Sequence, residues 1–86
     1  MKMDMNEIDA AEERAAMSLL DCVCVPTDKA RDAVEECMEL AGANALPYRT
    51  ERRRIEANMI LLKVLPRVDR TEFGRLHGMM MKMAVG

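Results

Sequence analysis

The sequence predicts an all-α domain, a compact four-helix arrangement resembling a bundle, on two main observations. Apolar residues recur at helical spacing along most of the chain, whereas the alternation typical of a strand is confined to CVCV at residues 22–25. The dipeptides Asn-Gly and Asp-Gly, which favour β-hairpin turns, do not occur. Because no linker or repeat divides the sequence, we expect one domain over residues 1–86, with residues 1–5 disordered.

The first two helices are predicted over residues 6–23 and 28–41, with Pro26 between them. In the first helix, small and apolar side chains fall on one face at spacings of three and four. In the second, Thr27 is placed to cap the N-terminus and Gly42 to provide a left-handed stop. The predicted core face of the second helix consists of Ala30, Ala33, Val34, Cys37, Met38 and Ala41.

The third helix is predicted to begin at Pro47 or Thr50 and to end at Leu65, before Pro66. Residues 57–65 are almost entirely apolar, and a helix that is apolar on most sides is buried on most sides. We therefore expect this helix to be the central element of the fold.

The fourth helix is predicted to begin after Thr71 as its N-cap. Its inner face is expected to hold four apolar side chains at spacings of three, four and three, with Met79 beside that face. Small size and ten Met residues favour self-association, most simply as a dimer. The candidate oligomer or partner strip is Phe73, Leu76, Met79, Met80 and Met83, unless these residues only close the core of the monomer.

The sequence favours a cytoplasmic protein that does not enter a membrane. Its start is acidic and lacks the apolar region of a secretory signal, and its longest apolar stretch, residues 59–65, is interrupted by Lys63. Three Cys residues, at positions 22, 24 and 37, are an odd number, so we expect reduced thiols, mostly buried.

Charge is divided unevenly along the chain. Residues 1–46 hold four Lys/Arg and eleven Asp/Glu, a net charge of −7, whereas residues 47–86 hold nine Lys/Arg and four Asp/Glu, a net charge of +5. Two interpretations follow: the halves face each other, within one chain or between chains, or they form separate patches for different partners.

Four arginines stand where the third helix begins, in the segment YRTERRR at 48–54. A helix N-terminus already carries positive partial charge, so these cations need an acidic neighbour or a bound anion. The candidate anion- or partner-binding residues are Tyr48, Arg49, Arg52, Arg53 and Arg54. The alternative is that Glu51, Glu56 and the acidic face of the second helix, in the same chain or in a second copy, neutralise the arginines.

The first two helices carry the opposite charge on their polar faces. The candidate acidic partner face is Glu12, Glu13, Asp28, Asp32, Glu35, Glu36 and Glu39. We expect all carboxylates to be solvated, without apolar surroundings that would perturb their pKa values.

The segment TEFGRLHG at 71–78 resembles the first helix and turn glycine of a phage-repressor-type helix-turn-helix. The resemblance implies DNA binding through a following recognition helix, but the chain continues as MMMKMAVG, which is too apolar to read base edges. The acidic total also disfavours contact with DNA phosphates, so we place DNA binding third among the functions.

Residue types needed for catalysis or metal binding are sparse. Ser18 and His77 are the sole Ser and His, no glycine-rich phosphate loop occurs, and the cysteines lack C-x-x-C spacing. Met residues near both ends and the Cys pair could suggest soft Cu(I) ligands, but Met at helical spacing is more often packing. We predict no catalytic residue, metal or cofactor.

The function that the sequence favours is that of a small regulator or inhibitor, not an enzyme, which acts by binding a larger macromolecule. Its partner would be a protein, and chains of this kind are common among phage and mobile-element proteins directed at host machinery. The second hypothesis is a binder of a small anionic ligand, such as a nucleotide, at Arg49–Arg54.

Overall fold

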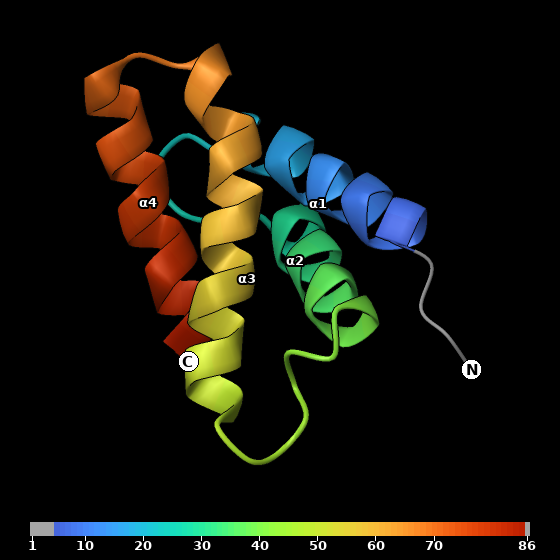
Figure 1. Cartoon of the computed structure of the whole chain (residues 1–86). Coiled ribbons are helices and arrows are strands. Elements are labelled where there is room, and N and C mark those ends of the chain that lie inside the picture. Colours follow the sequence, from blue (N-terminus) through green and yellow to red (C-terminus); the bar gives the residue numbers. More distant parts are fainter. Residues whose placement is uncertain (1–4, 86) are drawn as a thin grey trace.

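The computed structural model describes residues 5–85, which form two helical hairpins packed across each other (Figure 1). The elements are α1 (Met5–Leu20), α2 (Asp28–Leu40), α3 (Arg49–Val64), the 3-10 turn η1 (Leu65–Arg67) and α4 (Arg70–Val85). The predicted all-α, four-helix fold is confirmed. The disorder expected for residues 1–5 falls mostly outside the described residues, and Met5 is the first residue of α1.

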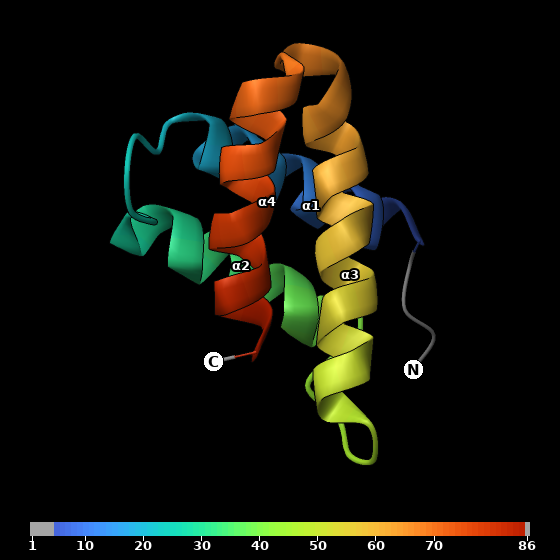
Figure 2. The ribbon, with the colours of Figure 1, turned by 90° about the vertical axis from the view of Figure 1, so that its left-hand side faces the viewer.

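The two hairpins cross at a steep angle. Figure 2 shows α3 and α4 running antiparallel in front of α1 and α2, which are antiparallel to each other. The packing is closest between α1 and α2, between α3 and α4, and between α1 and α3. Helices α1 and α3 each belong to two of these contacts, so the helix predicted to be central shares that position with α1.

Small side chains allow the hairpins to approach closely. On α1 the buried face is formed by Ala11, Ala15, Ala16 and Leu19. On the facing helices the largest buried side chains include Met38, Ile60, Leu61 and Leu76. Alanine brings the helix axes together, and the longer side chains fill the space that remains.

The predicted ends of α2 are confirmed. The backbone N–H of Ala30 donates to the Thr27 hydroxyl at 3.1 Å, so Thr27 is the N-cap. Gly42 follows the helix with a φ of 72°, a left-handed conformation that glycine adopts without steric cost.

The predicted starts of α3 and α4 are wrong by a few residues. Helix α3 begins at Arg49, after Tyr48, whose φ of 65° turns the chain into the helix, so neither Pro47 nor Thr50 is the start. Helix α4 begins at Arg70, because the Asp69 carboxylate accepts a hydrogen bond from the Glu72 N–H at 2.8 Å. Thr71 therefore lies inside the helix.

The prediction that all carboxylates are solvated is wrong for Glu12 and Glu56. Both are buried where α1, α2 and α3 meet, and the Cys37 thiol donates to Glu56 Oε2 at 3.4 Å. Burial, reinforced by a hydrogen bond with Glu12, raises the pKa of Glu56 to about 8. The core therefore favours the protonated form of Glu56 to a higher pH than an exposed glutamate would.

No helix within residues 5–85 is both long and apolar enough to cross a lipid bilayer.

Candidate functional site

Arg53 is buried near the start of α3. This end of α3 lies beside the C-terminal end of the antiparallel α4 (Figure 1). Its Nε donates to the carbonyl of Ala84 at 2.9 Å, and its Nη2 donates to the carbonyl of Met83 at 3.0 Å. Its guanidinium also donates twice to the Glu35 carboxylate and once to the Asn44 side chain. One side chain thus joins α2, the α2–α3 loop, α3 and α4.

These contacts explain the presence of Arg53 at a helix N-terminus. The last carbonyls of α4 have no partner within the helix and carry negative partial charge, so a cation beside them is favourable. The hydrogen bonds between Arg53 and Glu35 act on both groups. They hold the pKa of Glu35 below its usual range and raise the pKa of Arg53. The predicted role of Arg53 in binding a ligand is wrong, because its donors are already used inside the protein.

The other members of the predicted arginine cluster remain at the surface. Tyr48, Arg49, Arg52 and Arg54 are all exposed, and Arg49 lies close enough to Glu35 to lower the pKa of that carboxyl further. Arg52 and Arg54 form no ion pair with any residue of the segment 5–85. Anion binding by these exposed arginines stays a prediction.

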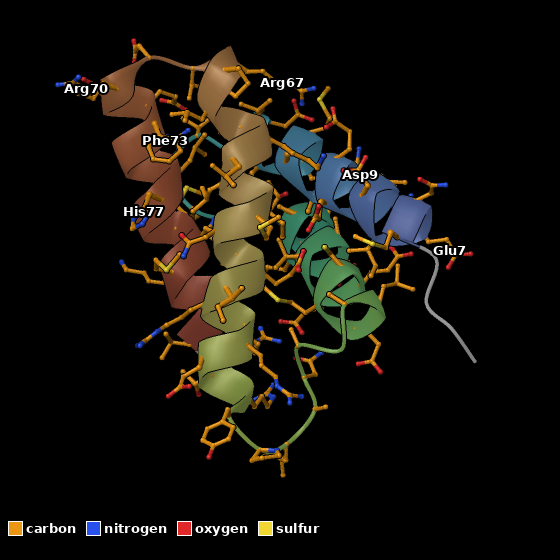
Figure 3. All side chains as sticks on the ribbon, viewed as in Figure 1. Glu7, Asp9, Arg67, Arg70, Phe73 and His77 are labelled. Atoms are coloured by element: carbon orange, nitrogen blue, oxygen red, sulfur yellow. The ribbon has the colours of Figure 1, made fainter. Side chains whose placement is uncertain are left out.

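The two oppositely charged halves face each other within the chain, as one of the two interpretations predicts. Figure 3 shows Asp9 on α1 and Arg67 at the turn between α3 and α4, two members of the ion pairs that join the halves. The pairs are Arg53–Glu35, Lys63–Asp9 and Arg67–Glu13. Through these three ion pairs, cations of the second half neutralise carboxylates of the first half within the same chain.

The acidic partner face is smaller than predicted. Glu12 is buried in the core and cannot belong to it. Glu13 and Glu35 are paired across the hairpins, and Glu36 lies 3.5 Å from Arg14. Within the predicted acidic face, the exposed carboxylates without a cationic partner among residues 5–85 are Asp28, Asp32 and Glu39.

An apolar stripe on α3 faces solvent, which the sequence interpretation missed. Ile55 is 64% exposed, Met59 is 44% exposed and Leu62 is 60% exposed, although the opposite face of the same helix is core. Their spacings of four and three place them on one face. The prediction that α3 is buried on most sides is wrong, because this helix has two apolar faces and the fold covers one of them.

The strip predicted on α4 belongs largely to the core. Leu76, Met79 and Met80 are buried, so Met79 also lies on the inner face and not beside it. Phe73 is partly buried, and its ring centroid is 6.2 Å from that of His77 on the outer side of α4 (Figure 3). Met83 is partly buried as well. Leu76, Met79 and Met80 therefore pack in the core, as the alternative predicts, and are not part of a surface strip.

The helix-turn-helix resemblance fails in the structure. Helix α4 continues from Arg70 through Gly74 and Gly78 to Val85 without a turn. The glycine that the resemblance places at the turn is therefore an ordinary helical residue.

Metal-ligand side chains do not gather in the described part of the chain. Within residues 5–85, no group of three or more His, Cys, Asp or Glu side chains is arranged to hold a metal ion. Comparison with known proteins adds no family: no family model, curated protein or solved structure matches the chain significantly.

Proposed function

We propose that this protein is a small regulator or inhibitor that acts by binding a larger protein through the outer face of α3. That face consists of Ile55, Met59 and Leu62, flanked by Arg52 and Arg54. The observation that carries the proposal is the exposure of three large apolar side chains in register on a helix anchored by its opposite face. Contiguous exposed apolar side chains with a charged border are typical of interaction surfaces.

The chemistry of the face indicates the chemistry of its partner. Its apolar side chains, at positions i, i+4 and i+7, match the spacing by which a helix inserts into a hydrophobic groove. Arg52 and Arg54 have no ion-pair partner within residues 5–85, so carboxylates on the partner would meet unpaired cations. The partner that fits is a protein with an apolar groove bordered by Asp and Glu.

Site-specific photo-crosslinking tests this assignment. A photoreactive amino acid replaces Met59 in cells that normally express the protein, and cross-linked peptides are identified by mass spectrometry. The expected product joins position 59 to one protein at a segment that combines apolar and acidic residues. The yield should fall when Ile55→Ser and Leu62→Ser are combined.

The matched control places the same photoreactive group at Glu39, on the acidic side of the molecule. Products of equal yield and identity from both positions would overturn the assignment. A product formed only with a second copy of the chain would also overturn it, because the face would then be a self-association surface.

A further inference from the structure

We infer that a cleft between the α1–α2 loop, α2 and the C-terminal half of α4 binds a small amphipathic anion. The cleft has a volume of about 550 Å³, within the range of small-molecule sites. Its lining residues come from α4, α2 and the loop that precedes α2, and Figure 2 shows α4 passing in front of α2. This site is distinct from the outer face of α3 and does not depend on the function proposed above.

The cleft has an apolar surface built from two segments that are distant in sequence. Val25 and Pro26 line it from the α1–α2 loop, and Met79 and Met83 line it from α4. Met79 is held in the core, whereas Val25 is 70% exposed. Flexible Met side chains can adjust to ligands of different shape, so this surface suits a flat or branched hydrocarbon body.

Two cations at the cleft have no ion-pair partner in the part of the chain that the structure describes. Arg31 of α2 and Lys82 of α4 both line it, are exposed, and form no ion pair with any residue from 5 to 85. Glu35 also lines the cleft, but its two oxygens accept hydrogen bonds from Arg53. The cations that remain are available to a ligand, whereas the carboxylate is neutralised.

These features define the class of ligand. An apolar surface beside two cations from different helices fits a ring or short hydrocarbon chain bearing a carboxylate, sulfonate or phosphate group. A nucleic acid or a protein would need a larger surface than this cleft offers.

The test uses 8-anilinonaphthalene-1-sulfonate, an aromatic sulfonate whose fluorescence rises in apolar surroundings. We expect saturable binding to the folded protein at one site per chain, measured by fluorescence titration and by calorimetry. The combined change Arg31→Gln with Lys82→Gln should weaken binding by about five- to tenfold, since two surface charge contacts are lost. The combined change Lys29→Gln with Arg70→Gln is the matched control, because it removes the same charge outside the cleft.

Cys24 reports whether the probe occupies this cleft. It lines the cleft and is exposed, whereas Cys22 and Cys37 are buried. The neutral disulfide 2,2′-dithiodipyridine should therefore modify Cys24 first, and saturating probe should slow that reaction. The neutral reagent avoids direct attraction to Arg31 and Lys82.

Three results would overturn the inference. The first is absence of saturable binding to the folded protein. The second is binding that leaves the reaction rate of Cys24 unchanged. The third is equal affinity of the cleft variant and the charge-matched control, with circular dichroism showing that both are folded.

Discussion

Arg53 occupies a position that is unfavourable for its own helix but favourable for the neighbouring helix. An arginine at a helix N-terminus conflicts with the helix dipole when the helix is considered in isolation. In the folded chain the same arginine lies at the C-terminal end of the neighbouring helix, where a cation is favourable. The arginine cluster predicts a nearby negative partner, but the sequence does not indicate that Arg53 meets the carbonyl oxygens of Met83 and Ala84 at the end of α4 as well as the Glu35 carboxylate.

Replacing Arg53 should destabilise the fold much more than replacing its neighbours. Arg53→Met leaves the Met83 and Ala84 carbonyls without donors, so we expect the free energy of unfolding to fall by about 2–4 kcal/mol. Arg52→Met and Arg54→Met should change it by less than about 0.5 kcal/mol, because both side chains are exposed. Urea unfolding followed by circular dichroism measures all three, and equal effects would contradict the role of Arg53.

Glu56 should make the protein less stable as the pH rises. Its pKa in the folded state is about 8, above the ordinary value of 4.5. Between these pH values the folded state holds a proton that the unfolded state has released, so increasing pH favours unfolding. The expected slope approaches about 1.4 kcal/mol per pH unit for this one group.

The variant Glu56→Gln should remove most of this slope between pH 5 and pH 8. Glu51→Gln is the control, because Glu51 is on the same helix but exposed. The measurement is the free energy of unfolding in urea at several pH values. A wild-type protein whose stability is constant or rises over this range would show that Glu56 is ionised in the core.

At the scale of elements, helical periodicity predicts where the helices lie better than it predicts which side faces inward. The inner face of α2 was predictable, since this helix has one apolar side and one polar side, whereas that of α1 was predictable only apart from the polar residues Glu12 and Ser18, which are buried. Helix α3 has apolar residues on two sides, and only the crossing of the hairpins decides that Ile60 is covered and Leu62 is not. That choice depends on contacts between segments distant in sequence.

Neighbouring residues of α3 should therefore respond differently to substitution. Leu61 is 2% exposed and Leu62 is 60% exposed. We expect Leu61→Ala to lower the free energy of unfolding by about 2–5 kcal/mol through loss of packing. Leu62→Ala should change it by less than about 0.5 kcal/mol. Similar losses for both variants in urea unfolding would mean that the outer face of α3 is buried in solution.

The start of α4 provides a second contrast. Asp69→Ala removes the side chain that accepts a hydrogen bond from the Glu72 N–H, so it should cost about 1 kcal/mol. Thr71→Ala should have little effect, because Thr71 is an exposed residue inside the helix. Thermal unfolding of the two variants distinguishes them, and a greater loss for Thr71→Ala would restore the cap predicted from sequence. Asp69 and Thr71 are both good capping residues, so local sequence alone could not separate them.

At the scale of the whole molecule, opposite charges in the two halves form ion pairs between the two hairpins. The ion pairs Lys63–Asp9 and Arg67–Glu13 both join the hairpins, with Arg53–Glu35 as a third, more buried link. The uneven charge made internal pairing predictable, but not the individual pairs. What remains unpaired is informative, because Arg52 and Arg54 lie near an apolar stripe and form no ion pair with any residue from 5 to 85.

The central claim concerns three of the four arginines of α3: Arg53 holds the fold, whereas Arg52 and Arg54 serve a partner. The most direct test is to measure cross-linking from position 59 in the variant that combines Arg52→Glu with Arg54→Glu, with folding checked by circular dichroism. The account predicts a folded protein whose cross-linked product is largely lost. A folded variant that retains the full yield would contradict it.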